Sequence, residues 1–329
     1  MTLTHRERLQ ACLANDPSLD RPPVALWRHF PVDDQDPEIL ARAALDFQRC
    51  YDFDLVKVTP ASSFSIKDWG AEDKWEGHTE GTRRYTRRVI EKPQDWESLP
   101  MLSPSSPHLA RQLTCLRYIR ADLPPDTPLL QTIFSPLAQA KNLAGGERLL
   151  IHLRQHPEAV LHGLETIAAT TRRFVEACMN IGIDGVFYAV QHAQAGILIL
   201  EEYEKFGIPF DLHILEPVMS LWCNILHLHG SHIYFKLAEQ YPCQIVNWHD
   251  RETGPSLAEG INNYRGVVCG GINQKTIVFG DRSEVQKEAA DAIAQTNGRR
   301  FILGTGCVVP IIAPHGNIMA ARQIVEMSE

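Results

Sequence analysis

The sequence lacks several patterns that would assign it to a well-defined class of protein. No apolar run approaches the roughly 20 residues of a membrane-spanning helix, and the opening residues MTLTHRER lack the apolar core of a signal peptide. No long basic run is present, and 40 acidic against 32 basic residues give a formal charge of -8, which argues against a nucleic-acid-binding surface. We therefore expect a cytoplasmic protein that acts on small molecules, without nucleic-acid or membrane partners.

Close cysteine pairs are also missing. The eight cysteines are spread singly along the chain, which excludes the usual spacing of a disulfide framework or a zinc ribbon. Seven of them are expected to be plain core residues. The eighth, Cys307, is treated separately below because of the residues around it.

Short apolar runs alternate with amphipathic helical stretches along the 329 residues. Buried parallel strands are continuous apolar runs, whereas a helix such as 283–296 carries a single apolar stripe. Eight alternations and 44% apolar composition predict an α/β fold, a single (β/α)8 TIM barrel domain over residues 1–329. A doubly wound open sheet is the alternative, but no glycine-rich phosphate loop follows the first strand. The expected strands are 23–27, 54–59, 129–134, 185–191, 223–229, 244–249, 266–273 and 300–304.

One segment is too long to be a simple connection between a strand and a helix. Residues 67–106 are polar and rich in tryptophan and charge. We expect them to form an excursion near the barrel mouth, where they would act as a lid.

His227 and His229 end the apolar run of the fifth expected strand, and Cys307 follows the eighth. Residues at i and i+2 of a strand point to the same face, and active residues of a barrel gather where strands end. Three nitrogen and sulfur ligands with a fourth position open to substrate are the usual arrangement of catalytic zinc. The pattern therefore predicts a zinc site made of His227, His229 and Cys307. The alternative is that all three are ordinary core residues.

Further charged residues lie at other strand ends. His249 and Asp250 follow the sixth strand, where each is a further metal ligand, a partner that orients an imidazole, or a substrate contact; the sequence leaves these roles open. The Arg28 guanidinium, after the first strand, can hold a carboxylate or phosphate through two hydrogen bonds. Lys57 lies within an apolar strand and is expected to face the barrel mouth or an acid. The candidate catalytic residues are thus Arg28, Lys57, His249 and Asp250.

Polar and aromatic residues beside these positions are the candidate substrate contacts. They follow strands one, four, six and seven, at the same end of the predicted barrel. The candidate substrate-binding residues are Arg28, His29, Gln191, His192, Gln194, Trp248 and Asn273.

Taken together, these elements resemble the uroporphyrinogen decarboxylase superfamily over nearly the whole chain. The superfamily comprises porphyrinogen decarboxylases and zinc-dependent methyltransferases that act on corrinoid-bound methyl groups. The resemblance depends on Arg21-Pro22-Pro23-Val24 leading to Trp27-Arg28, on Ile133-Phe134-Ser135-Pro136-Leu137, on His227-Leu228-His229-Gly230, on Gly271-Ile272-Asn273 and on Gly306-Cys307-Val308-Val309-Pro310.

The methyltransferase branch binds zinc through a His-x-Cys pair on strand five and a later cysteine. By this resemblance His227 is the histidine, His229 replaces the first cysteine, and Cys307 is the later one. A neutral imidazole in place of a thiolate makes the site less electron-rich. The decarboxylase branch fits less well, because Arg28 matches the first arginine of its motif but Val32 stands where the second is expected.

The resemblance implies a zinc-dependent methyltransferase that moves a methyl group between a corrinoid and a thiol or small methylated substrate. The implied cofactors are Zn²⁺ and a corrinoid (methylcobamide) carried on a separate protein. Besides the small-molecule substrate, the expected partners are that corrinoid protein and, as an open alternative, a second copy in a homodimer. The rival functions are a carboxy-lyase acting on a tetrapyrrole, a metal-dependent hydrolase and a barrel without catalysis.

Overall fold

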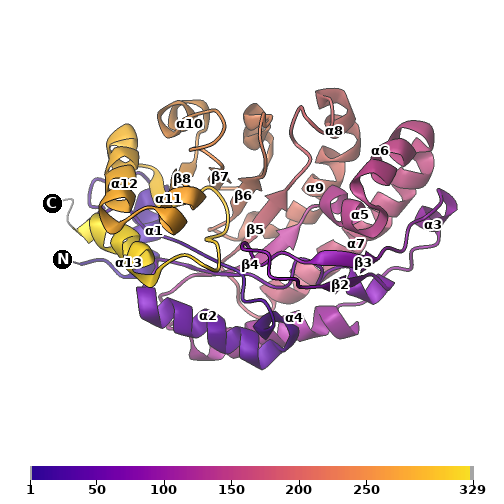
Figure 1. Cartoon of the computed structure of the whole chain (residues 1–329), viewed down its shortest axis with the longest axis horizontal. Helices are drawn as coiled ribbons and strands as arrows, with labels where there is room; N and C mark the ends of the chain where they lie inside the picture. Colours follow the sequence, from indigo (N-terminus) through magenta and orange to yellow (C-terminus); the bar gives the residue numbers. More distant parts are fainter. Residues whose placement is uncertain (1, 327–329) are drawn as a thin grey trace.

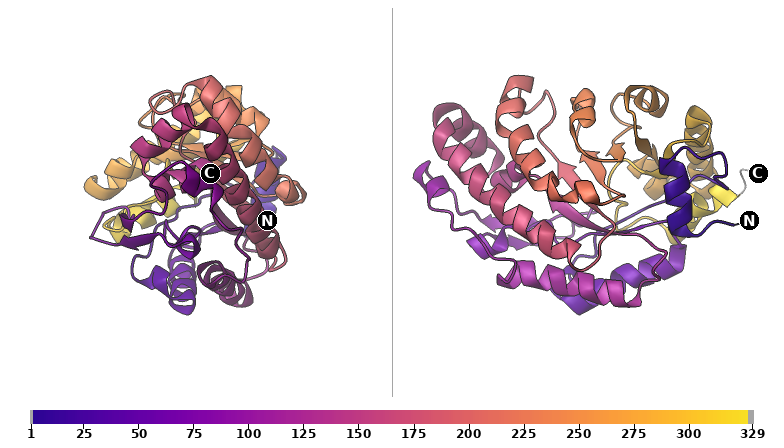
Figure 2. Two further views of the ribbon diagram at one scale, coloured as in Figure 1. Left: turned by 90° about the vertical axis from the view of Figure 1, so that its right-hand side faces the viewer. Right: turned by 180° about the vertical axis from the view of Figure 1, so that it is seen from behind.

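The computed structural model describes residues 2–326, in which seven parallel strands form one curled sheet in the order β1-β4-β5-β6-β7-β8-β9. Helices surround this sheet, as Figure 1 and the two further views of Figure 2 show. Most strands are buried along their whole length, as the continuous apolar runs predict. The strands are β1 (Val56–Val58), β4 (Leu129–Phe134), β5 (Gly185–Val190), β6 (Ile225–Leu228), β7 (Ile245–Trp248), β8 (Val267–Ile272) and β9 (Phe301–Thr305).

The helices follow the strands in the alternating order that the sequence predicts. Those in the described part of the chain are α1 (His5–Leu13), α2 (Pro37–Tyr51), α3 (Gln94–Glu97), α4 (Pro107–Asp122), α5 (Pro136–Ala144), α6 (Gly146–Gln155), α7 (Pro157–Met179), α8 (Leu200–Phe206), α9 (Ile208–Leu215), α10 (Leu257–Asn263), α11 (Gln274–Phe279), α12 (Arg282–Thr296) and α13 (His315–Gln323). Among them we find none with the length and apolar character needed to cross a membrane.

The first expected strand, 23–27, is reduced to a single bridge between Val24 and Leu303. It nevertheless closes the ring. The amide of Ala25 donates to the Leu303 carbonyl at 2.9 Å, and on the other side the Asp54 amide donates to the Val24 carbonyl at 2.9 Å. Because Pro23 has no N–H, the ladder cannot extend toward the N-terminus. The predicted barrel is confirmed, with its first strand shorter than expected.

The register of the central strands decides which side chains meet at the mouth. Ala189 of β5 is opposite His227 of β6, which in turn is opposite Asn247 of β7. Residues at one height in a barrel share a layer when they point inward. The strands thereby bring the imidazole of His227 beside the amide of Asn247.

The helix after β4 begins at a defined position. Ser135 accepts a hydrogen bond from the amide of Ala138, and Pro136 occupies the first helical position, where its missing N–H costs nothing. The start of α5 thus follows from the sequence Ser-Pro. It places Lys141 on the second turn of α5.

The excursion predicted at 67–106 is also present. It contains a short antiparallel hairpin of β2 (Glu72–Lys74) and β3 (Arg84–Arg87), followed by α3. The carbonyl of Thr79 accepts a hydrogen bond from the amide of Ile311 at 2.7 Å, which ties the hairpin turn to the loop after β9. The segment therefore lies at the mouth of the barrel, and its action as a lid stays a prediction.

Candidate metal centre and substrate cavity

Four side chains converge where β6, β7 and β9 end: His227, His229, His249 and Cys307. Each offers one ligand atom, and these atoms all lie within 4.8 Å of one another. Nδ1 of His229 is 3.2 Å from Nε2 of His249 and 3.9 Å from Sγ of Cys307. The structure thus brings the three predicted ligands together and adds a fourth, His249.

The donor set fits a zinc ion. Tetrahedral zinc with its usual bond lengths requires about 3.3 Å between two nitrogen ligands and about 3.6 Å between a nitrogen and a sulfur. The measured separations around His229, 3.2 Å and 3.9 Å, are close to both values. Imidazole and thiolate are also the ligand types that zinc favours over magnesium or calcium.

Asn247 determines which nitrogen of His227 faces the cluster. The amide nitrogen of Asn247 donates to the carbonyls of Cys269 and Thr305, at 2.9 and 3.1 Å. Its oxygen is therefore directed at Nδ1 of His227, 2.7 Å away, which must carry the proton. The lone pair of Nε2 remains available for a metal, in the arrangement by which proteins commonly orient metal-binding imidazoles.

Burial prepares the imidazoles to act as ligands. It holds the pKa of His227 well below its usual value, and burial, followed by the neighbouring His249, lowers the pKa of His229 to about 4. Burial also lowers the pKa of His249. It raises the pKa of the Cys307 thiol to about 11, so a metal that binds at neutral pH must displace one proton from this residue.

A cavity of about 530 Å³ opens beside the cluster. His227, His229 and Cys307 form part of its wall, and residues of the excursion, Glu80 and Tyr85 among them, form another part. A cavity of this size suits a small molecule. It lies at the carboxyl ends of the strands, where barrels of this type place their active sites.

Comparison with known proteins agrees with this architecture. Residues 6–327 match the sequence profile of the family "Uroporphyrinogen decarboxylase (URO-D)". The chain belongs to this family. Among solved structures, a methyltransferase from Methanosarcina mazei superposes on this family member with a TM-score of 0.84, at 16% identity over 99% of both chains.

A second similar structure is a B12-independent methionine synthase from Shewanella sp. W3-18-1, in complex with selenomethionine. Its TM-score is 0.61 at 14% identity, over 93% of this chain and 94% of that one. At such identities both likenesses show the fold alone. A search of curated protein sequences finds no significant match.

Several predicted substrate contacts of this URO-D family member line the cavity, namely His29, Gln191, His192 and Gln194, and so does the candidate catalytic residue Lys57. Nζ of Lys57 lies 3.2 Å from the Thr59 hydroxyl and 4.5 Å from the centre of the Phe187 ring. Burial lowers the pKa of this lysine to about 7.

The loop after β5 presents two glutamines in different ways. The Gln194 side chain donates to the carbonyls of Gln191 and His229, at 2.8 and 3.1 Å, and so connects this loop to the one that carries the metal cluster. Oε1 of Gln191 instead accepts a hydrogen bond from Nζ of Lys141 at 2.7 Å.

Five predicted site residues lie outside the cavity lining: His249, which belongs to the metal cluster, and Arg28, Asp250, Trp248 and Asn273. Arg28 lies over the ring of Phe30, 5.5 Å from its centre. The Asp250 carboxylate accepts from the amide of Gly271 at 3.1 Å, and burial raises its pKa to about 7. Trp248 is fully buried, and its ring nitrogen donates to a backbone carbonyl. Asn273 caps α11 by accepting from the second helical amide.

Reasoning from the sequence missed two residues of the site. Lys141 reaches the cavity from α5, seven residues after the end of β4, too far along the chain for a rule about strand ends to select it. Asn247 does stand at a strand end, and its pairing opposite His227 was the available signal. Side chains alternate between the two faces of a strand, so Asn247 and Trp248 must point to opposite faces of β7. Choosing the residue that faces the barrel interior would have selected Asn247 in place of Trp248.

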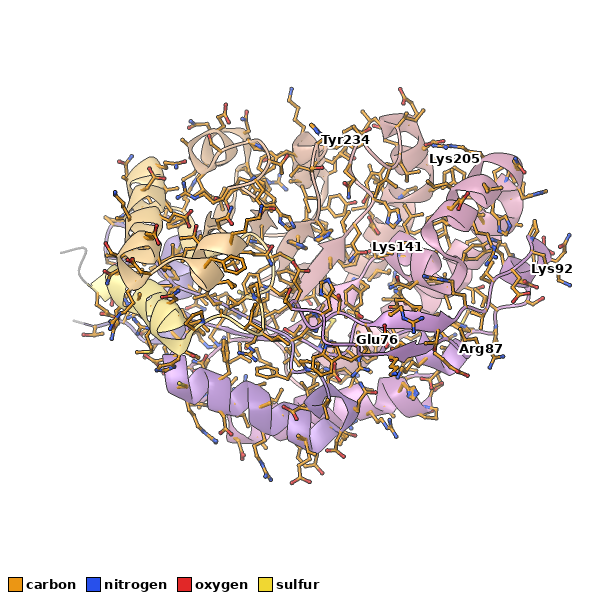
Figure 3. All side chains as sticks on the ribbon, in the orientation of Figure 1. Glu76, Arg87, Lys92, Lys141, Lys205 and Tyr234 are labelled. Atoms are coloured by element: carbon orange, nitrogen blue, oxygen red, sulfur yellow. The ribbon has the colours of Figure 1, made fainter. Side chains whose placement is uncertain are left out.

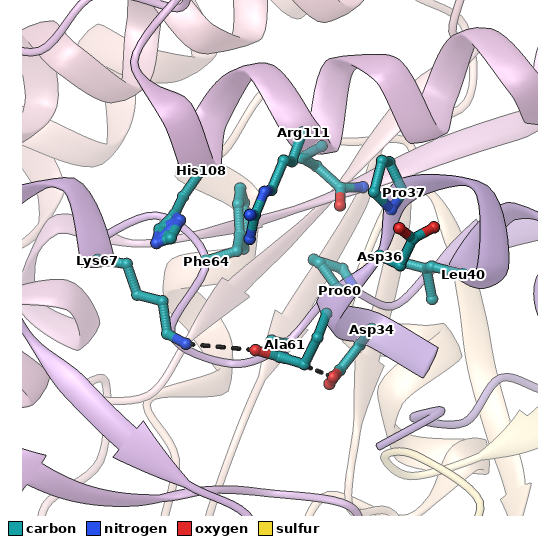
Figure 4. Close-up of a pocket in the computed structure, with 12 residues that line it drawn as sticks. Asp34, Asp36, Pro37, Leu40, Pro60, Ala61, Phe64, Lys67, His108 and Arg111 are labelled. Atoms are coloured by element: carbon teal, nitrogen blue, oxygen red, sulfur yellow. Dashed lines mark hydrogen bonds between the residues drawn. The ribbon is translucent and has the colours of Figure 1, made fainter. Parts of the chain in front are cut away.

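A smaller cavity of about 40 Å³ lies at the outer side of the mouth, between the segment before α2 and the start of α4 (Figure 4). The charges of Lys67 and Asp34 in its lining are paired within the protein, that of Lys67 with Asp73 at 3.4 Å. Lys67 donates to Gln35, which donates to Asp34, and Arg83 forms ion pairs with Asp34 and Asp73 at 2.7 and 3.3 Å. The Arg83 charge is therefore compensated within the protein, although its side chain also borders the large cavity.

Proposed function

We propose that the protein is a zinc-dependent methyltransferase that transfers a methyl group between a corrinoid and the sulfur of a small substrate. The observation that carries this proposal is the cluster of three imidazoles and one thiol at the wall of a substrate-sized cavity. We further propose that residues 1–329 act as one barrel domain.

His227, His229 and Cys307 would be the ligands that face the cavity, and His249 would occupy the fourth position until a substrate thiol replaces it. Zinc held there would lower the pKa of a substrate thiol from its ordinary value of about 8.5, so that the thiolate is present at neutral pH. In the overall reaction the thiolate sulfur forms a bond to the methyl carbon. The electron pair of the carbon–cobalt bond remains on the corrinoid.

The chain's own residues would orient the substrate. Asn247 keeps the proton of His227 on Nδ1 throughout, because its amide nitrogen is bound to two carbonyls. Phe187 packs on the His227 ring, 5.3 Å between centres, and limits water on that side. We propose that the corrinoid is presented by a separate protein.

The similar structures support methyl transfer as a class, because one is named a methyltransferase and another a methionine synthase. The description of the second as B12-independent provides a specific alternative for the donor. A donor other than a corrinoid would use the same sulfur-binding site.

The test begins with metal content. Purified protein should contain about one zinc per chain, and His229→Ala should lose it, whereas His213→Ala on the surface helix α9 should retain it. The zinc-loaded protein, incubated with methylcobalamin and a thiol such as 3-mercaptopropionate, should then convert the corrinoid spectrum and form the thioether. Zinc without any methyl transfer from methylcobalamin would reject the corrinoid donor, and absence of zinc would reject the metal centre itself.

A further inference from the structure

The cavity beside the metal cluster contains two ammonium groups, those of the buried Lys57 and the half-buried Lys141, for which the described chain shows no carboxylate partner. Nζ of Lys57 has one hydroxyl partner, Thr59, at 3.2 Å. Nζ of Lys141 has one amide partner, Gln191, at 2.7 Å. Burial lowers the pKa of both lysines, which shows that each would gain from a nearby negative charge. In Figure 3, Lys141 lies toward the centre of the molecule, whereas Lys92 lies at its edge.

Each lysine is accompanied by an imidazole with an unused nitrogen. Nδ1 of His29 and Nδ1 of His192 are buried without a hydrogen-bond partner, and the two residues are only 6% and 2% exposed. Burial, followed by the charge of Lys57, lowers the pKa of His29 to about 3; burial, followed by the charge of Lys141, does the same for His192. We call the first pair the Lys57 site and the second the Lys141 site.

The remaining charges of the cavity do not neutralise these two sites. Glu80 is the single carboxylate in the lining, and its described partner is an amide, that of Gln274 at 3.4 Å. Arg83 adds no free positive charge because Asp34 and Asp73 pair with it. Two ammonium groups without carboxylate partners in a largely buried wall are costly unless a bound molecule supplies acceptors.

The two lysines approach the metal cluster through different neighbours. Nζ of Lys57 lies 4.5 Å from the centre of the Phe187 ring, and that ring stacks on His227 at 5.3 Å. Lys141 binds Gln191, whose carbonyl is joined through the Gln194 side chain to the carbonyl of His229. A molecule whose reacting atom is held at the cluster would therefore extend toward both lysines.

We propose that the substrate carries two acidic groups, one bound at the Lys57 site and the other at the Lys141 site, with its reacting group between them. The chemical class is a dicarboxylate or an equivalent dianion. The role of this molecule as the methyl-transfer substrate rests on the proposed function, but its binding does not.

Binding of simple diacids to the metal-free protein tests this proposal separately from the metal chemistry. Metal is removed with a chelator, and isothermal titration then compares succinate, adipate and suberate with their monoamides of equal length. The best diacid should bind about 10- to 100-fold more tightly than its monoamide, since a charge-assisted hydrogen bond is lost with the second carboxylate. Lys57→Met and Lys141→Met should each remove a similar factor for the diacid, and Lys92→Met at the exposed edge should change nothing.

The comparison within the wild-type protein needs no variant, so a folding defect cannot obscure it. Equal affinity of diacid and monoamide at all three lengths, or diacid binding that survives in the double variant Lys57→Met/Lys141→Met, would overturn the proposal. Failure of every diacid to bind would do the same. If the protein binds stoichiometric zinc but no diacid, this proposal is wrong and the proposed function is unaffected. If it binds a diacid but no zinc, the metal centre is wrong and this proposal is unaffected.

Discussion

Replacing Asn247 by leucine should weaken zinc binding although Asn247 is not itself a ligand. The side chain accepts the Nδ1 proton of His227 and donates to two backbone carbonyls. Loss of an outer partner of a metal-bound imidazole typically lowers metal affinity about 10- to 100-fold, or about 1.4 to 2.7 kcal/mol. Three lost hydrogen bonds at about 1 kcal/mol each should also reduce the free energy of unfolding by about 3 kcal/mol.

Asn317 provides a matched control. It is buried, and its amide nitrogen likewise donates to two carbonyls, those of Ile277 and Gly280, at 3.1 and 2.7 Å. Asn317→Leu should therefore cost about 2 kcal/mol of stability and leave the zinc affinity unchanged. The difference between the two variants isolates the hydrogen bond to His227.

The assay is competition for zinc against a chromophoric chelator, combined with urea unfolding of the metal-free proteins. The expected result is weaker zinc binding in Asn247→Leu and wild-type binding in Asn317→Leu, with both proteins destabilised. If the two variants bind zinc equally well, the amide does not control the imidazole, and the argument for a fixed tautomer of His227 is wrong.

Three other outcomes follow from the same structure. Cys307→Ala should lower zinc affinity by more than about 100-fold, because removing a direct ligand weakens metal binding more than removing a residue that only orients a ligand. Cys243→Ala should leave zinc affinity unchanged, and zinc analysis after dialysis distinguishes the two variants. Burial raises the pKa of Asp211 to about 6, although three tyrosine hydroxyls donate hydrogen bonds to its carboxylate and oppose the shift. The folded protein therefore keeps a proton that the unfolded chain releases near pH 4, and the free energy of unfolding should fall by on the order of 2 kcal/mol as the pH rises from about 4 to about 6. Asp211→Asn should flatten that slope in urea titrations. Gly185→Ala would push a methyl group into a backbone carbonyl and should cost about 3 kcal/mol or prevent folding, whereas Gly196→Ala, with open space around it, should leave the unfolding midpoint nearly unchanged.

The barrel and the convergence of three predicted ligands could be reasoned from residues because they depend on strand periodicity. In a parallel barrel all carboxyl ends meet at one face, so residues after separate strands come together without further information. His227 and His229, two positions apart, share a side for the same reason. The first strand was overestimated because its apolar composition does not reveal how far a proline-bounded segment can pair.

The selection among loop residues required the tertiary structure. His249 and Asp250 are neighbours of similar polarity, yet one faces the metal cluster and the other accepts from the amide of Gly271. The guanidinium of Arg28 packs on Phe30 and lies outside the cavity lining. Lys141, which comes from a helix, lines the cavity instead.

By itself, then, the sequence determined the order of the buried strands, and with it the end of the barrel at which the candidate site residues gather. The three-dimensional structure decided which side chains enter the cavity, which charges there are already paired, and that a fourth ligand joins the cluster. The physical reason is range: alternation along a strand is a local property of the backbone, whereas beyond a strand's last residue the direction of a side chain depends on contacts with segments far away in the chain.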